Sequence, residues 1–210
     1  MKRDVAGIIL AGGQSRRMGG GDKSLLPLGS GCVLDQVVSR FGPQIAPLAL
    51  SANGDPARFS RFGLPVLADT VTGFAGPLAG ILTGLEWAVA NTACKAIVTA
   101  AGDTPFPPLD LVERLAAATD QSPGSIAVAC SAGKRHPTFA LWPTDCRDAL
   151  RHFLVDEDNR RVSAFIDRHG FADVEFPVLQ SAGRPVDPFF NINEPNDLVW
   201  AERLLQSMKP

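Results

Sequence analysis

Short apolar runs alternate along this chain with longer segments of helical periodicity, and this alternation restricts the fold more than any other feature of the sequence. The runs are bounded by Gly, Pro and Asp, as strands are, and several are apolar on both faces. Strands of that kind belong to a parallel sheet that helices cover on both sides. The expected strands are residues 5–10, 46–52, 65–68, 95–101, 125–130 and 138–142.

The segments between these strands have the spacing of amphipathic helices, over residues 32–41, 77–91, 108–118 and 145–155. Pro77 suits a first-turn position. A further stripe follows Asn193 and consists of Leu198, Ala201, Leu204, Leu205 and Met208. We therefore expect residues 1–210 to form a single α/β domain, a Rossmann-like three-layer sandwich with a mostly parallel central sheet. In such a fold the ligand binds outside the carboxyl ends of the strands.

The charge balance and the cysteines exclude several classes of protein. Lys and Arg number 20 and Asp and Glu 22, so no basic excess suited to coating nucleic acid is present. The apolar run near the N-terminus is interrupted by Asp4 and is too short for a signal peptide or a membrane span. The four cysteines form no CxxC pair or metal-ligand cluster, which indicates reduced thiols and the cytoplasm. We expect neither nucleic acid nor membrane as a partner.

A glycine-rich, basic stretch follows the first expected strand, IILAGGQSRRMGGGDKSLLPL at residues 8–28. Ordering glycine is costly in backbone entropy, and the usual gain is close approach of backbone N–H groups to phosphate. A Walker loop does not fit, because Asp22 precedes Lys23 and Ser24, and the dinucleotide fingerprint GxGxxG is absent. The stretch therefore predicts a phosphate site of another kind.

The order LAGG at residues 10–13, then Arg16, MGG at 18–20 and DK at 22–23 resembles the nucleotidyltransferase superfamily, and within it the molybdenum cofactor guanylyltransferases (MobA family). Blocks shared with that family continue downstream, with SAN at 51–53, Asp69, GPLAGI at 76–81, DTPF at 103–106, RHPTFAL at 135–141, RRV at 160–162 and NIN at 191–193. Ser51, Gly102 and Glu194 depart from the commonest pattern, and Ser51 leaves open which side chain contacts the base.

This resemblance implies transfer of GMP from GTP to the terminal phosphate of Mo-molybdopterin, with release of pyrophosphate. The attacking phosphate oxygen is already anionic at neutral pH, so positioning and charge neutralisation suffice and no catalytic His or Ser is needed. The N-terminal part of the domain would bind nucleotide and the C-terminal part molybdopterin. The implied partners are these two substrates, with transient contact to molybdopterin-delivering proteins and to acceptor molybdoenzymes.

The resemblance also assigns the catalytic groups, namely Arg16, Lys23 and Asp103. Asp103 follows an expected strand, and one carboxylate with substrate phosphates and water suits Mg²⁺. The alternative for Asp103 is a carboxylate that only caps the turn before Pro105. The alternative for the glycine-rich stretch is a turn whose basic side chains are solvated. The residues expected at GTP are Leu10, Ala11, Gly12, Gly13, Lys23, Ser51, Asn53, Asp69 and Asp103.

The base and the pterin are assigned by fewer observations. The Asp69 carboxylate can accept hydrogen bonds from guanine N1–H and N2–H, although a turn-forming Asp is the alternative. Ser51 and Asn53 are candidates for reading the base or the ribose, with a similar alternative. The candidates for molybdopterin are Asn191 and Asn193, with His136, Arg160 and Arg161 as further members of shared blocks. A histidine before proline in a strand-entry loop is more often structural than functional. The two arginines are equally a solvated helix face or a protein contact.

Three other functions remain open at this point. Two are the same chemistry with another nucleotide or acceptor, in a molybdopterin cytidylyltransferase or a sugar-phosphate nucleotidyltransferase. The third is a nucleotide-binding regulator without turnover. Retention of Arg16, Lys23 and Asp103 together argues against the regulator.

Overall fold

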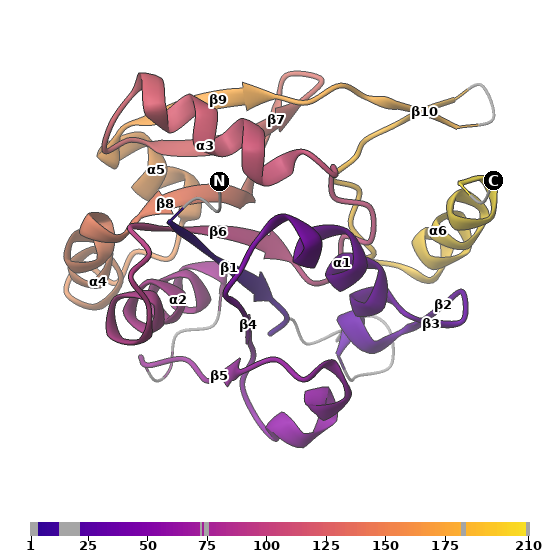
Figure 1. Ribbon diagram of the computed structural model, residues 1–210, viewed down its shortest axis with the longest axis horizontal. Coiled ribbons are helices and arrows are strands. Elements are labelled where there is room, and N and C mark those ends of the chain that lie inside the picture. Colours follow the sequence, from indigo (N-terminus) through magenta and orange to yellow (C-terminus); the bar gives the residue numbers. More distant parts are fainter. Residues whose placement is uncertain (1–3, 13–21, 72, 74–75, 182–183, 209–210) are drawn as a thin grey trace.

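A seven-stranded sheet forms the centre of the protein, in the order β5-β4-β1-β6-β8-β7-β9 (Figure 1). The computed structural model describes residues 4–12, 22–71, 73, 76–181 and 184–208. The strands are β1 Val5–Leu10, β4 Leu48–Ser51, β5 Val66–Leu67, β6 Ala96–Ala101, β7 Ile126–Ser131, β8 Lys134–Pro143 and β9 Phe171–Glu175. Strand β8 is antiparallel to both of its neighbours, and the other adjacent pairs are parallel. The predicted α/β domain with a mostly parallel sheet is confirmed.

Helices cover both faces of this sheet and give it two separate hydrophobic cores. Helices α1 Val33–Phe41 and α3 Leu111–Gln121 bury Val37, Phe41 and Leu115 on one face. Helices α2 Pro77–Asn91, α4 Arg147–Val155 and α5 Val162–His169 pack on the other face and bury Ile81, Leu150 and Phe165. The strands contribute to both cores because their alternate side chains point to opposite faces, which explains the continuous apolar runs in the sequence. The predicted three-layer arrangement is confirmed.

The turn between β7 and β8 explains why β8 is antiparallel to its neighbours in the sheet. Two residues join the strands, Ala132 at φ 49° and Gly133 at φ 73°, and Ser131 pairs with Lys134 across the turn. Positive φ at both central residues is the type I′ geometry, and a two-residue link can connect only antiparallel strands. Strand β8 therefore begins at Lys134, earlier than the expected residue 138. Helix α3 begins three residues later than expected, at Leu111, after a turn that starts at Pro108.

This turn offers a test of local stability. Ala132 is exposed and holds a left-handed conformation that its side chain disfavours by roughly 1–2 kcal/mol. We expect Ala132→Asn to raise the free energy of unfolding by about 0.5–1 kcal/mol, because Asn before Gly suits a type I′ turn. Ala132→Val should lower it instead, since β-branched residues tolerate positive φ poorly. Chemical denaturation measures both changes, and equal stability of the two variants would contradict the turn geometry.

Several elements escaped the sequence analysis. They are helix α5, strand β9, the 3₁₀ helix η4 Pro56–Phe62, and the hairpins β2 Pro27–Leu28 with β3 Gly31–Cys32 and β10 Leu179–Ser181 with β11 Arg184–Val186. Most are short, and strand β9 lies at the edge of the sheet with mainly half-buried or exposed side chains. Edge strands and short hairpins carry too few apolar positions to produce a clear period.

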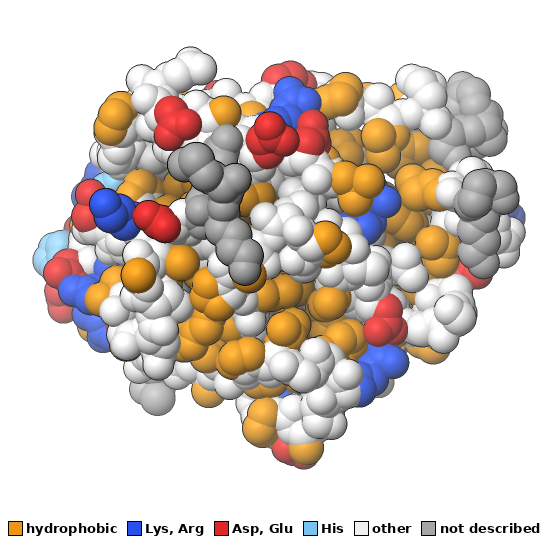
Figure 2. All heavy atoms as spheres, in the orientation of Figure 1, with side chains coloured by type: hydrophobic (Ala, Val, Ile, Leu, Met, Phe, Trp, Pro, Cys, Tyr) orange, Lys and Arg blue, Asp and Glu red, His pale blue; other side chains and the backbone are white. Residues whose placement is uncertain are grey.

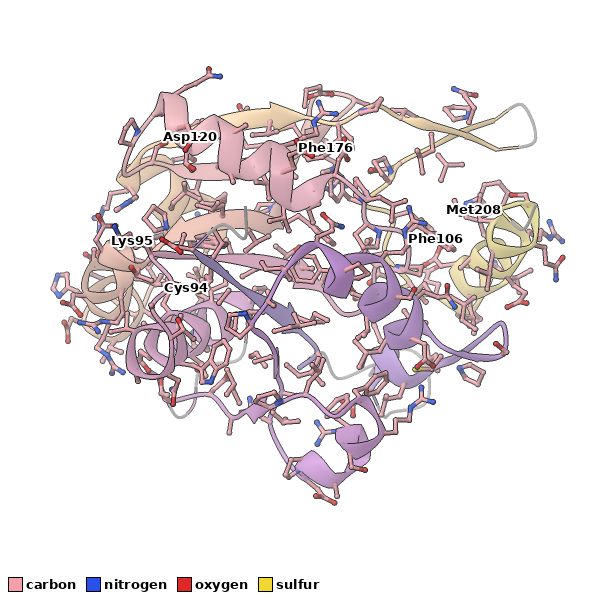
Figure 3. The ribbon with its side chains drawn as sticks, in the orientation of Figure 1. Cys94, Lys95, Phe106, Asp120, Phe176 and Met208 are labelled. Atoms are coloured by element: carbon pink, nitrogen blue, oxygen red, sulfur yellow. The ribbon has the colours of Figure 1, made fainter. Side chains whose placement is uncertain are left out.

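A third, smaller core joins the C-terminal helix α6 Pro195–Ser207 to the rest of the domain. In Figure 1, α6 lies at the right of the view beside β2 and β3. Phe106, labelled in Figure 3, packs in this core with Ala201 and Leu204 of α6. Of the predicted C-terminal stripe, Met208 is exposed. This core places the segment before α6 next to the loop that follows β6.

Charged side chains lie in small mixed groups around the rim of the face that Figure 2 shows, with basic and acidic side chains side by side. Within the described part of the chain, no helix is long and apolar enough to cross a membrane.

Candidate active site

A cleft of about 1530 Å³ opens at the carboxyl ends of β1, β4 and β6, beside the β7–β8 hairpin. Many of the residues that the sequence analysis selected line it, namely Leu10, Ala11, Gly12, Lys23, Ser51, Asn53, Asp69, Asp103, His136 and Asn191. Gly13 and Arg16 lie outside the described residues. The edge of a parallel sheet is where an α/β fold presents ligand groups, so segments far apart in the sequence meet here.

The end of β1 is held on both sides by backbone hydrogen bonds. The Ala11 N–H donates to the Ser51 carbonyl oxygen at 2.9 Å, and the Gly102 N–H donates to the Leu10 carbonyl oxygen at 2.9 Å. The Ala11 N–H is therefore occupied within the protein, so it is not the expected donor to a phosphate. A Cβ on Gly102 would lie 3.1 Å from the Leu10 oxygen, so a larger residue there would require a shift of a few tenths of an ångström.

Lys23 is held at the cleft by the segment that precedes α6. Its Nζ donates to Asn193 Oδ1 at 2.7 Å. The Asn193 N–H in turn donates to Asp197 Oδ2 at 2.8 Å, within the capping box that begins α6. The Lys23 ammonium is thereby oriented by a residue 170 positions away in the sequence.

The same segment also contacts the loop that carries Asp103. The Ile192 N–H donates to the Asp103 carbonyl oxygen at 2.9 Å. Asn191 and Asn193 flank this contact: Asn191 lines the cleft, whereas Asn193 binds Lys23 and is not among the described lining residues. The sequence analysis assigned these two residues to the pterin, whereas the geometry puts Asn193 in contact with a group expected at the nucleotide.

The environment of Asp103 suits a cation. Burial raises the pKa of this carboxyl, and the nearby Lys23 ammonium acts in the opposite direction. A carboxylate that is desolvated in this way gains from a positive charge placed beside it. The described residues contain no group of three or more His, Cys, Asp or Glu side chains that could hold a metal ion. One carboxylate fits Mg²⁺, which usually binds through one or two carboxylates, substrate phosphates and water.

Asn53 and Asp69 form a reciprocal pair across two strand ends. The Asn53 side-chain amide donates to Asp69 Oδ2 at 2.7 Å, and the Asp69 N–H donates to Asn53 Oδ1 at 2.9 Å. The pair fixes the direction of the Asp69 carboxylate at the cleft. Ser51 is buried nearby against α2, where a Cβ on Gly80 would come within 2.6 Å of its Oγ.

Arg58 joins this site although the sequence analysis did not select it. Its Nε donates to Asp22 Oδ2 at 2.5 Å, and its two other nitrogens bind the carbonyl oxygens of Asn53 and Asp55. No motif includes Arg58, and it lies on a 3₁₀ helix that has no clear apolar period. Contact across 36 positions in the sequence is visible only in the folded chain.

His136 belongs to a buried polar network in the β7–β8 half of the cleft. Its Nε2 lies 2.7 Å from Ser131 Oγ, and that hydroxyl donates to Asp187 Oδ1 at 2.7 Å. Because the Ser131 hydrogen is used on Asp187, the His136 Nε2–H is the donor to Ser131. Burial lowers the pKa of His136, and Asp187 acts against that shift. The imidazole also packs on Phe189 with ring centroids 4.5 Å apart.

The three arginines of the C-terminal blocks have other partners. Arg135 forms ion pairs with Asp173 at 2.7 Å and Asp167 at 3.0 Å, and its guanidinium lies over the Phe171 ring. Arg160 pairs with Asp158 at 3.2 Å, and Arg161 is the N-cap residue of α5. Neither Arg160 nor Arg161 is among the described residues that line the cleft.

Comparison with known proteins places this arrangement among nucleotidyltransferases. The family model described as the MobA-like NTP transferase domain matches residues 7–172. A curated relative from Mesorhizobium japonicum, named molybdenum cofactor guanylyltransferase, is 81% identical over 208 residues, which are 99% of this chain and 99% of the relative.

Two solved structures share the fold at low sequence identity. The molybdopterin-guanine dinucleotide biosynthesis protein A of Archaeoglobus fulgidus superposes with a TM-score of 0.74 at 22% identity, over 97% of this chain and 100% of that one. A 4-diphosphocytidyl-2C-methyl-D-erythritol synthase from Anaerococcus prevotii gives a TM-score of 0.71 at 12% identity, over 98% and 96% of the two chains. The fold alone therefore does not decide which nucleotide is bound.

Proposed function

Because this chain belongs to the MobA-like NTP transferase family, we propose that it transfers GMP from GTP to the terminal phosphate of Mo-molybdopterin and releases pyrophosphate. The observation that carries this proposal is that Lys23 and Asp103 line one cleft with Asp69 and His136, and that Asn193 binds Lys23. Lys23, Asp103 and Asn193 come from three separate parts of the chain. The 81% identity to a guanylyltransferase extends over nearly the whole chain and supports the same assignment.

The groups at the cleft fit a reaction that needs positioning and charge neutralisation. The acceptor phosphate oxygen is anionic, so the protein is not required to remove a proton from it. Lys23, oriented by Asn193, places an ammonium where negative charge builds up on the leaving pyrophosphate. We assign Mg²⁺ to Asp103, where the bound ion would neutralise phosphate charge. Arg16 is expected to contribute a second cation, although it lies outside the described residues.

The guanine is assigned to Asp69. Its Oδ2 is occupied by the Asn53 amide, which orients the carboxylate so that it can accept from guanine N1–H and N2–H. Cytosine does not present two such donors together, which favours GTP over CTP. Ser51 is buried and packed against α2, so its part is to support this end of the cleft.

Base choice is tested by thermal melting with each of the four nucleotides. At about 100 times its dissociation constant, Mg-GTP should stabilise the protein by roughly 2.7 kcal/mol, and CTP should stabilise it much less. The comparison needs no molybdopterin, so it examines the nucleotide site alone. Equal shifts with GTP and CTP would contradict guanine specificity and favour the cytidylyltransferase. Pyrophosphate release separates an enzyme from a nucleotide-binding regulator.

Molybdopterin is assigned to the half of the cleft formed by the β7–β8 hairpin and the segment near Phe189. His136 and Asn191 line this half together with Lys134 and Thr138. This retains the division of the domain into an N-terminal nucleotide part and a C-terminal molybdopterin part. Asn193 orients Lys23 and is therefore assigned to the nucleotide part.

The cytoplasm is the compartment we propose. The four cysteines are free thiols, and three of them are buried. We also propose transient contacts with the proteins that deliver molybdopterin and receive the product.

A further inference from the structure

We propose that Arg58 is a positioning residue that locks the Lys23 segment and the Asn53 loop together, and so sets the spacing between the groups that hold the phosphates and the groups that hold the base. This inference rests on the proposed function, because it assigns those two ends of the cleft to one nucleotide. It concerns a residue outside the glycine stretch and the downstream motifs.

The first contact of Arg58 is to the residue directly before Lys23. Its Nε and Asp22 Oδ2 are 2.5 Å apart, and the two side chains are only 25% and 16% exposed. An ion pair with this much shielding from water is stronger than an exposed one. Asp22 also begins the short 3₁₀ helix Lys23–Leu25, so its position determines where the Lys23 stem leaves the backbone.

The other contacts of Arg58 are to the backbone of the Asn53 loop. Nη2 donates to the Asn53 carbonyl oxygen and Nη1 to the Asp55 carbonyl oxygen, both at 2.5 Å. Gly54 lies between these carbonyls at φ 86°, and a Cβ there would approach Nη1 to 3.3 Å. The Asn53 side chain continues the chain of contacts to Asp69. One guanidinium therefore links the phosphate end to the base end.

The geometry of the guanidinium suits this task. Each of its three nitrogens donates to a protein oxygen, so its hydrogen-bonding capacity is largely used within the protein. Its Cζ also lies 4.6 Å from the centroid of the Phe59 ring, which restrains the side chain further. A planar fork can reach three oxygens in different directions, whereas a lysine ammonium cannot reproduce that arrangement. Arg58 is thus placed to orient neighbouring segments.

Arg61 provides a matched control on the same 3₁₀ helix. Its guanidinium lies 4.6 Å from the Phe62 ring centroid, and it forms an ion pair at 2.5 Å with Asp35 of α1. Arg61→Ala therefore removes an arginine, a ring contact and an ion pair, as Arg58→Ala does. Its partners lie outside the cleft lining, so it should leave nucleotide binding unchanged.

The test is a double-mutant cycle on Arg58→Ala and Asp22→Ala, with Arg61→Ala as control. Calorimetry gives the Kd for Mg-GTP, steady-state pyrophosphate release gives KM and kcat, and a thermal melt reports folding. We expect each single variant to raise Kd and KM about tenfold, which is typical of losing one hydrogen bond to a charged group. The double variant should be no worse than either single variant. Arg61→Ala should stay within about twofold of the parent.

Additive losses in the double variant would show that Arg58 acts on the nucleotide without Asp22, and would overturn the proposal. Unchanged binding in Arg58→Ala would overturn it as well. Arg58→Lys and Asp22→Asn repeat the cycle if an alanine variant fails to fold, and Arg58→Lys should remain impaired. If the parent binds another nucleotide in place of GTP, the proposed function fails, and the same cycle with that nucleotide still decides the role of Arg58.

Discussion

Lys23→Ala should lower the rate of pyrophosphate release by about 10²- to 10³-fold, equivalent to about 2.7–4 kcal/mol of transition-state stabilisation. The structure supplies the physical reason, because the Lys23 ammonium is held at the cleft by Asn193 at 2.7 Å. A charge that is oriented before the reaction requires no reorganisation as the leaving pyrophosphate becomes more negative. Folding stability should change little, since the Lys23 side chain is not part of a hydrophobic core.

Steady-state pyrophosphate release with Mo-molybdopterin as acceptor measures this loss, and a thermal melt of the variant without ligand controls for folding. Lys23→Arg should restore only part of the rate, because a wider planar fork leaves the stem in a different geometry. Asn193→Ala should give a smaller loss in the same direction, since it keeps the ammonium and removes its support. A Lys23→Ala variant that melts normally and turns over within threefold of the parent would assign the chemistry to other groups.

Asp103→Asn should reduce Mg-dependent pyrophosphate release by at least about 10²-fold, while nucleotide affinity falls much less. The carboxylate is desolvated at the cleft, which is why burial raises its pKa, and the substitution removes the negative charge that would attract the ion. The fold should persist, because the backbone contact to this residue uses its carbonyl oxygen and the Ile192 N–H, which the substitution leaves in place.

Calorimetric titration with GTP separates affinity from turnover in this variant. The Mg²⁺ concentration that gives half-maximal rate is measured for both the parent and the variant. Asp148→Asn is a suitable control, since Asp148 pairs with Arg147 on α4 and neither residue is among the described residues that line the cleft. Near-normal pyrophosphate release in Asp103→Asn would mean that the ion is held elsewhere or is not required.

The layers of the fold could be predicted because their signals are local and periodic. Residues 5–10 and 77–91 were expected as a strand and a helix, and the structure has β1 and α2 over the same ranges. A continuous apolar run indicates a strand buried on both faces of a sheet, and helical spacing indicates a helix buried along one face. Both signals come from residues that are close together in the sequence. Strand β9 has no such apolar pattern, because an edge strand buries fewer side chains.

The candidate site residues were predicted where a short motif marks them. Lys23 and Asp103 were selected from their own segments, and the structure brings both to the carboxyl edge of the sheet, as an α/β fold requires. Their electrostatic coupling was not visible in the sequence, since it depends on the distance between two segments about 80 residues apart. The support that Arg58 gives to Asp22 was missed for the same reason.

The sequence by itself thus determined the α/β class and the family, because local periodicity and short motifs contain that information, and it predicted which residue types meet phosphate. Only the tertiary structure decided how those residues are oriented. It placed Asn193 on Lys23, Arg58 between Asp22 and the Asn53 loop, and His136 on Ser131. Each of these arrangements depends on contacts made when the chain packs, and a hydrogen bond is set by distance and angle in space, which spacing along the chain does not encode.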